Sequence, residues 1–139
     1  MDKNEMMLLL KKAPLFSRVN EQGLEAILNV AEEMTFPAKT KIVSKGVTGV
    51  GFYLILKGSV EVSHAGEQIA TLKAGTFFGE MALLDREPRS ADVIALEDTK
   101  CLALRKWDLK TIIERDSEVA LAMLEELARR LRKTGETLS

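Results

Sequence analysis

The strongest indication of the fold class lies in residues 52–62, which run Phe52-Tyr53-Leu54-Ile55-Leu56-Lys57-Gly58-Ser59-Val60-Glu61-Val62. The first half is apolar and rich in residues that favour β-strands, and Gly58 then interrupts the run. In the second half Val60 and Val62 alternate with polar residues, which is the period of a strand that buries one face. The segment therefore predicts two consecutive short strands joined at a glycine.

Further short strands are expected on both sides of this pair, separated by turn residues. The candidates are Lys41–Ser44, a strand through Ile69 and Leu72 that returns from a hairpin turn at Ala65-Gly66-Glu67, Ala91–Ala95, and Thr99–Leu104 after a turn at Glu97-Asp98. So many short strands at close spacing predict an antiparallel β-roll, a jelly-roll-like double-stranded β-helix, over about residues 33–105.

The hydrophobic period becomes helical on either side of the predicted roll. Before it, helices are expected over about residues 4–31, interrupted at Pro14, with Asn20 as the N-cap of the second helix. After it, Trp107–Arg115 predicts a short helix, and a longer helix capped by Ser117 is expected to reach about residue 134. The predicted fold class is therefore α+β, with residues 1–139 forming a single domain.

The last predicted helix carries apolar residues at steps of three and four. These residues are Ala120, Leu124, Leu127 and Leu131. The stripe can pack on the roll as a lid, or it can pair with the same helix of a second copy of the chain. The sequence leaves both interpretations open, and an exposed stripe would favour a homodimer through this helix.

The composition limits the partners and the compartment. Apolar residues make up 46% of the 139 residues, which is enough for a core, while 20 basic against 21 acidic residues leave a net charge of -1. This balance gives no electrostatic reason to expect direct binding to nucleic acid or to an anionic membrane. The lone Cys101 excludes an internal disulfide, and the N-terminus has no apolar run long enough for a signal sequence, so a cytoplasmic protein is expected.

Residues 77–91 contain the side chains best suited to ligand chemistry. They run Phe77-Phe78-Gly79-Glu80-Met81-Ala82-Leu83-Leu84-Asp85-Arg86-Glu87-Pro88-Arg89-Ser90-Ala91. Gly79 before a short helical run offers unpaired backbone N–H groups that can bind an anion. Arg89 presents a planar set of donors suited to phosphate, Ser90 adds a hydroxyl, and Glu80 can accept from sugar hydroxyls. The segment therefore predicts a phosphate-and-sugar site, although Glu80 and Arg89 would also suit a surface ion pair over a turn.

The same segment resembles the phosphate-binding cassette of cyclic-nucleotide-binding domains, the family of catabolite activators and of cAMP-dependent kinase regulatory subunits. That cassette has the pattern F-G-E-x-A-L followed by P-R-[AST]-A, and this chain has Phe78-Gly79-Glu80-Met81-Ala82-Leu83 and Pro88-Arg89-Ser90-Ala91. The resemblance extends to Pro14-Leu15-Phe16, to residues 52–62 and to Ala128-Arg129-Arg130-Leu131. The segment Gly46-Val47-Thr48-Gly49-Val50 departs from the family, which often has acidic residues in this turn.

The resemblance implies a role for each matching residue. Glu80 would accept the ribose 2′-hydroxyl, Arg89 would pair with the cyclic phosphate and Ser90 would add a hydroxyl. The backbone around Gly79, Met81 and Ala82 would complete the cradle, with Phe78 and Ala91 at its two ends. Thr134 falls where the family places a helix residue that contacts the purine.

The predicted chemistry is binding without turnover. The only histidine, His64, is isolated in the sequence, with no Ser–His–Asp or Cys–His arrangement and no second His, Cys or acid cluster to form a metal site, so neither enzymatic activity nor a metal or other cofactor is expected. The expected ligand is cAMP, with cGMP possible, and the C-terminal helix is expected to relay binding to an unknown effector protein or domain. The alternatives are a regulatory fragment of a Crp/Fnr-like transcription factor, a cyclic di-GMP-binding domain, and an interaction domain that binds no nucleotide.

Overall fold

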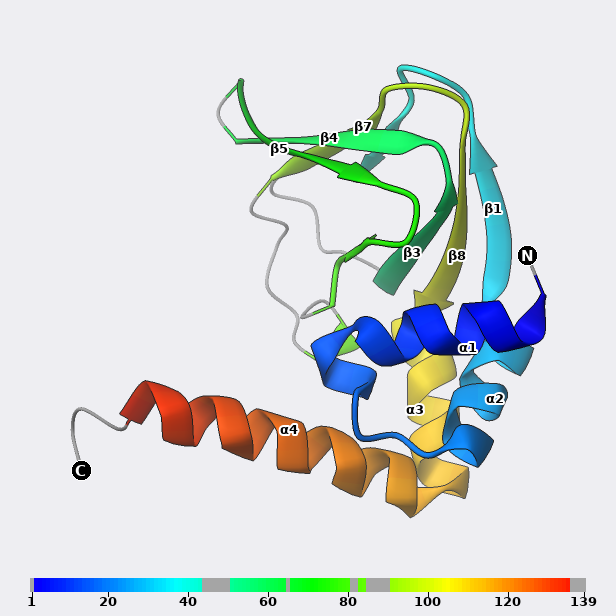
Figure 1. The fold of residues 1–139 in the computed structure, drawn as a ribbon, viewed down its shortest axis with the longest axis vertical. Helices are drawn as coiled ribbons and strands as arrows, with labels where there is room; N and C mark the ends of the chain where they lie inside the picture. The colour runs from blue at the N-terminus through cyan, green and yellow to red at the C-terminus, as the bar shows by residue number, and fades with distance from the viewer. Residues whose placement is uncertain (1, 44–50, 65, 81–82, 85–90, 136–139) are drawn as a thin grey trace.

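Eight antiparallel strands form two sheets in the part of the chain that the structure, a computed structural model, describes: residues 2–43, 51–64, 66–80, 83–84 and 91–135. In spatial order, the first sheet contains β1 (Glu32–Phe36), β8 (Thr99–Arg105), β3 (Gly51–Lys57) and β6 (Phe77–Phe78). The second contains β2 (Lys41–Val43), β7 (Asp92–Ala95), β4 (Ser59–His64) and β5 (Glu67–Lys73). The strands of the second sheet cross above those of the first (Figure 1), which confirms the predicted roll.

Strands β3 and β8 are buried on both faces because they separate two hydrophobic clusters. The helix-side cluster lies between the first sheet and the helices, and the interior cluster lies inside the roll. In β3, Phe52 and Leu54 face the helices, whereas Tyr53 and Ile55 face the interior of the roll. Strand β8 divides in the same way, with Leu102 facing the helices. This alternation follows from the two-residue period of a strand, and it explains why residues 52–56 are almost uniformly apolar in sequence.

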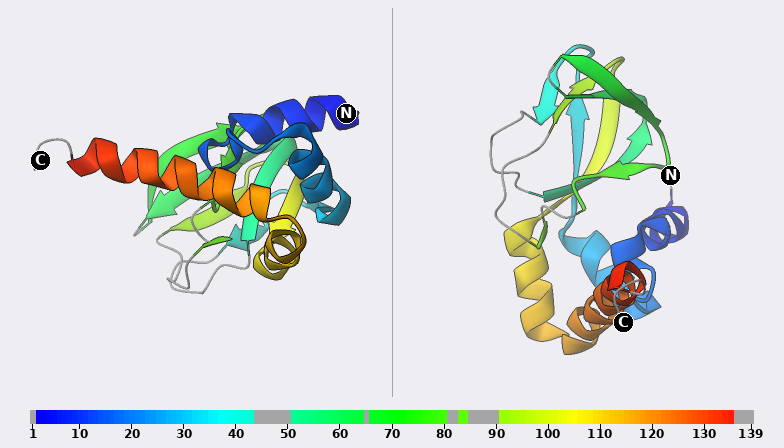
Figure 2. Two further views of the ribbon diagram at one scale, coloured as in Figure 1. Left: turned by 90° about the horizontal axis from the view of Figure 1, so that it is seen from below. Right: turned by 90° about the vertical axis from the view of Figure 1, so that its left-hand side faces the viewer.

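Five helical segments gather at one end of the roll (Figures 1 and 2). They are α1 (Lys3–Lys12), the short 3₁₀ helix η1 (Pro14–Phe16), α2 (Glu21–Val30), α3 (Lys106–Arg115) and α4 (Ser117–Gly135) in the described residues. The predicted N-cap of α2 is confirmed, because the Asn20 side chain accepts a hydrogen bond from the Gly23 N–H at 2.8 Å. None of the described helices is long and apolar enough to cross a membrane.

The predicted cap of the last helix is displaced by one residue. Ser117 is itself the first helical residue, and the carboxylate of Asp116 accepts from the Glu118 N–H at 3.1 Å. Asp116 also ends α3, so one residue separates the two helices. The acidic side chain is the better cap here because it faces the positive end of the dipole of α4.

Of the two interpretations of the apolar stripe on the last helix, packing against the rest of the domain is wrong. Helix α4 buries Val119, Ala122, Met123 and Glu126, whereas Leu124 and Leu131 are 61% and 74% exposed. Leu127 alone of the four predicted residues packs, partly buried, on the helix-side cluster. The true packing face is rotated by roughly one residue, about 100° around the helix, from the predicted one. That rotation brings a carboxylate, Glu126, into the interior.

Candidate functional site

Two consecutive aromatic side chains fix the start of the candidate ligand segment. Phe77 stacks on Phe52 in the helix-side cluster, with ring centroids 5.7 Å apart. Phe78 points to the other face of β6 and stacks on Tyr53 at 5.0 Å inside the roll. Because both rings are held in the core, Phe78 has only its backbone to offer to a ligand. The backbone that follows therefore starts from a strand whose position is fixed by packing.

The chain turns sharply directly after this strand. Gly79 adopts a φ of 84°, in the left-handed region that side chains with a Cβ rarely enter. The Leu83 N–H then donates to the Glu80 carbonyl at 3.3 Å, and the Leu83 side chain is buried in the helix-side cluster. The glycine and the buried leucine together aim the Glu80 side chain toward the helices.

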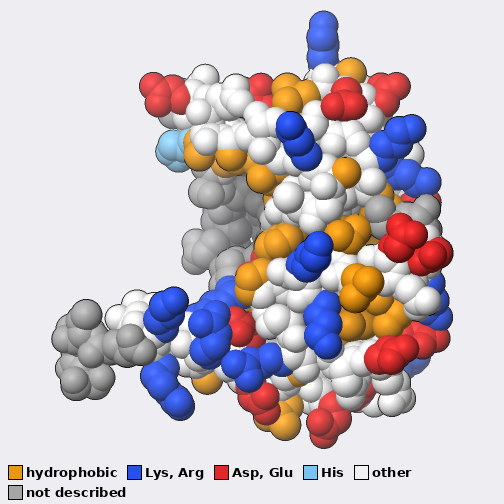
Figure 3. Space-filling view, viewed as in Figure 1, with side chains coloured by type: hydrophobic (Ala, Val, Ile, Leu, Met, Phe, Trp, Pro, Cys, Tyr) orange, Lys and Arg blue, Asp and Glu red, His pale blue; other side chains and the backbone are white. Residues whose placement is uncertain are grey.

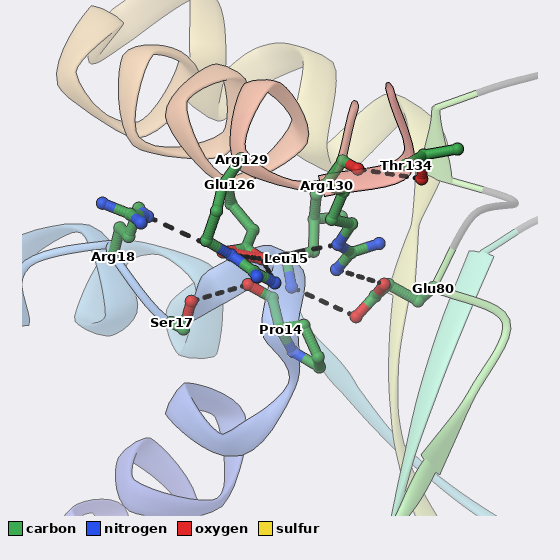
Figure 4. A network of polar contacts seen from close by, with 9 residues as sticks. All are labelled: Pro14, Leu15, Ser17, Arg18, Glu80, Glu126, Arg129, Arg130 and Thr134. Atoms are coloured by element: carbon green, nitrogen blue, oxygen red, sulfur yellow. Dashed lines mark hydrogen bonds and ion pairs between the residues drawn. The ribbon is translucent and has the colours of Figure 1, made fainter. Parts of the chain in front are cut away.

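The Glu80 carboxylate joins three elements of the fold (Figure 4). Its Oε2 accepts a hydrogen bond from the Leu15 N–H of η1 at 3.1 Å. Its Oε1 accepts from the Arg130 guanidinium of α4 at 2.8 Å, with the Glu80 side chain only 12% exposed. One carboxylate therefore links the turn after β6 to both the C-terminal helix α4 and the N-terminal turn, which comprises η1 and the two residues after it (residues 14–18).

A second carboxylate, Glu126, lies close by on α4. Arg129 reaches both of its oxygens, through Nε at 2.8 and 3.2 Å and through Nη2 at 2.9 Å. Arg130 adds a longer contact at 3.4 Å and Arg18 an ion pair at 3.6 Å. The hydrogen bond from Arg129 and the nearby positive charges outweigh burial and lower the pKa of Glu126 to about 2. The group is thus a carboxylate throughout the neutral range.

The structure places part of the predicted ligand set and leaves part of it untested. Met81, Ala82, Arg89 and Ser90 lie outside the described residues. Ala91 is half-buried and directly precedes β7. Thr134 lies on the exposed surface of α4, one turn beyond Arg130, and its hydroxyl donates to the Arg130 carbonyl at 3.0 Å. Glu80 is therefore brought to the helix that carries Thr134, through Arg130.

Three participants in this network have no role in the expected ligand set: Leu15, Glu126 and Arg130. Arg129 and Arg130 both pair with Glu126. A signal was present, since Glu126 precedes the two arginines by three and four residues, the spacing of neighbours on a helix. The contact with Glu80 spans 50 residues and has no local signal.

Residues 33–116 match the family model of the cyclic nucleotide-binding domain. Among curated proteins, the chain is 36% identical over 129 residues to the cyclic AMP receptor protein of Thermus thermophilus, covering 89% of this chain and 60% of that protein. It is 32% identical to the cAMP-dependent protein kinase regulatory subunit of Hypocrea atroviridis, over 91% of this chain and 26% of that protein. The chain thus spans less than two thirds of these relatives.

The structure also superposes on solved structures of similar proteins. The N-terminal domain of a transcriptional regulator from Streptomyces coelicolor superposes with a TM-score of 0.86 at 29% identity, over 94% of this chain and 97% of that one. The catabolite activator protein of Thermus thermophilus superposes with a TM-score of 0.68 at 35% identity, over 91% of this chain and 62% of that one. These similarities cover the N-terminal helices, the roll and the C-terminal helices together.

Proposed function

Since the chain belongs to the cyclic-nucleotide-binding domain family, we propose that it is a regulatory module that binds cAMP, without catalytic activity, and relays binding through α4. In this proposal Arg89 pairs with the cyclic phosphate, assisted by Ser90 and by the backbone of Gly79, Met81 and Ala82. Two relatives named for cAMP support this choice of ligand, and the 34% identical cGMP-dependent protein kinase of Drosophila melanogaster keeps cGMP as the alternative. The observation that carries the relay is the contact of Glu80 with Arg130.

Glu80 retains the acceptor capacity that a ribose hydroxyl needs. An ionised carboxylate can accept about four hydrogen bonds, and the Leu15 N–H and Arg130 take one on each oxygen. These two donors orient the group without saturating it. Ligand binding at Glu80 would therefore act directly on the group that anchors α4. The nucleotide would then make different contacts in the two positions of this helix, which is what a ligand needs in order to shift the helix from one position to the other.

Hydrogen exchange of the α4 amides tests the relay. We expect cAMP to change the hydrogen-exchange protection of residues 124–135, because the Arg130 contact that holds this segment involves the same carboxylate as the proposed ligand site. The amides of strand β8, which lies in the core, serve as the internal control and should change little. Unaltered exchange throughout α4 under saturating cAMP would rule out the relay.

The exposed side of α4 supports a homodimer as the assembled form. Leu121, Leu124, Ala128 and Leu131 follow one another at steps of three, four and three, and the three leucines are among the exposed large hydrophobic residues. This is the spacing of a coiled-coil seam. Figure 3 shows Lys and Arg side chains gathered on the protruding end of α4.

We expect the Leu124→Arg variant to sediment as a monomer at concentrations where the unmodified chain is dimeric. An arginine at a central seam position places like charges against each other in a symmetric pair. Leu8→Arg, an equally exposed leucine on α1, is the matched control and should leave the sedimentation coefficient unchanged. An unmodified chain that is monomeric at every concentration would contradict the proposed homodimer.

The chain itself does not identify the output, which we propose to be an effector domain or a partner protein in the cytoplasm. The similarity to the Streptomyces coelicolor regulator domain favours a transcription-regulator context. Cyclic di-GMP is the competing ligand class, and titration with that dinucleotide beside cAMP distinguishes the two.

A further inference from the structure

The second carboxylate of the network, Glu126, is buried to an extent that glutamates rarely reach. It is 3% exposed, and glutamate is almost never fully buried unless it is paired. Here the pairing comes from two elements, with Arg129 and Arg130 on α4 and Arg18 in the segment between η1 and α2. Glu126 thus forms ion pairs with arginines on both sides of the contact between α4 and the N-terminal turn.

Arg130 lies between the two carboxylates. Its Nη2 donates to Glu80 Oε1 at 2.8 Å while its Nε lies 3.4 Å from Glu126 Oε2 (Figure 4). A guanidinium is planar and rigid, and Nε and Nη2 are both bonded to its central carbon, so a carboxylate beside Nε restricts the direction in which Nη2 points. Glu126 therefore favours the orientation in which Arg130 faces Glu80.

The N-terminal turn closes the network into a ring. Leu15 and Arg18 are three residues apart in the chain, and Leu15 donates to Glu80 while Arg18 pairs with Glu126. Going round, Glu80 contacts Arg130, Arg130 contacts Glu126, Glu126 contacts Arg18, and the chain from Arg18 to Leu15 returns to Glu80. A displacement of either carboxylate consequently changes contacts of both the N-terminal turn and α4.

We propose that Glu126 is a positioning residue for the nucleotide site, which holds Arg130 against Glu80 and couples the N-terminal turn to α4. The inference rests on the proposed function, because the group that it positions is the expected ribose acceptor. It goes beyond that function by assigning a role to a residue outside the cassette. The described charged groups that pair with Glu126 are cationic (Arg18, Arg129 and Arg130). The hydrogen bond from Arg129, with the charge of Arg129 and the contact of Arg130, lowers the pKa of Glu126 to about 2, so it acts as a fixed charge at neutral pH.

The test compares Glu126→Gln with Glu125→Gln. Both substitutions remove one negative charge from the same turn of α4, but Glu125 is exposed whereas Glu126 is buried. The first readout is the ¹⁵N–¹H resonance of Arg130 Nε in the protein without ligand, assigned by its disappearance in Arg130→Lys. The second readout is the dissociation constant for cAMP from calorimetric titration, with circular dichroism as a check on folding.

We expect Glu126→Gln to shift the Arg130 Nε resonance, to speed its exchange with solvent and to weaken cAMP binding about tenfold, a typical coupling within one ion-pair network. Glu125→Gln should match the unmodified chain in both readouts. A folded Glu126→Gln variant with unchanged Arg130 resonance and unchanged affinity would overturn the inference. If Glu126→Gln does not fold, Glu126→Asp, which keeps the charge and shortens its reach, takes its place and is expected to give the same two changes.

The two readouts separate this inference from the proposed function. If the unmodified chain binds no cAMP, the proposed function fails, while the Arg130 resonance still decides whether Glu126 orients the arginine. If cAMP binds tightly and both readouts are insensitive to Glu126, the proposed function stands and the positioning role is excluded.

Discussion

Replacing Phe16 with alanine should lower the free energy of unfolding by about 3–5 kcal/mol, the usual cost of truncating a buried aromatic side chain. Phe16 is completely buried, and its ring meets that of Phe52 edge-on at a centroid distance of 5.4 Å. It lies in η1, where the helices pack on the first sheet, and rigid strand β3 is on its other side. The surroundings therefore cannot collapse easily into the space that the substitution leaves.

Urea unfolding followed by circular dichroism measures this loss. Leu8→Ala is the control, because Leu8 is 66% exposed on α1 and its truncation should change the free energy of unfolding by no more than about 0.5 kcal/mol. A loss below about 1 kcal/mol for Phe16→Ala would mean that η1 is not packed as described.

Replacing Glu80 with glutamine should weaken cAMP binding about 10- to 100-fold, which corresponds to the loss of one hydrogen bond that involves a charged group. Glutamine has nearly the same shape and keeps one acceptor oxygen. It has only one such oxygen to divide among Leu15, Arg130 and the ribose hydroxyl, and it leaves Arg130 without its charged partner on this side. Under the proposed function, Glu80 would therefore both bind the ligand and anchor α4.

Calorimetric titration measures the affinity of Glu80→Gln, with Glu67→Gln on the exposed part of β5 as the control for loss of one charge. The control should bind as the unmodified chain does. Equal affinity in Glu80→Gln would remove the carboxylate from the binding site and leave it a purely structural role between η1 and α4.

The regular elements of the fold could be predicted because their signals are local. Strand β3 is apolar at every position from Phe52 to Ile55 because it lies between two clusters, and the N-cap of α2 is visible as Asn20. Strand β1 was harder to recognise, since Glu32 and Glu33 begin it and only Met34 and Phe36 pack against the interior cluster. Its pairing with β8 is between segments more than 60 residues apart, so it depends on tertiary contacts that periodicity does not contain.

The candidate site divides in the same way. The motif around Gly79 and Glu80 was visible in sequence, and the positive φ of Gly79 supplies the physical reason for that glycine. The partners of Glu80 were not visible, because Leu15 precedes it by 65 residues and Arg130 follows it by 50. The rotation of α4 that buries Glu126 is likewise decided by packing on the helix-side cluster, which the spacing of leucines alone did not reveal.

Calorimetric titration of cAMP and of cGMP is the most direct test of the proposed function. The protein is first unfolded and refolded to remove any bound nucleotide, and Arg89→Ala is titrated beside it. We expect tight binding of cAMP that is lost in Arg89→Ala, since that arginine is the proposed partner of the cyclic phosphate. A folded protein that gives no heat with either nucleotide would contradict the account and favour the dinucleotide or interaction-domain alternatives.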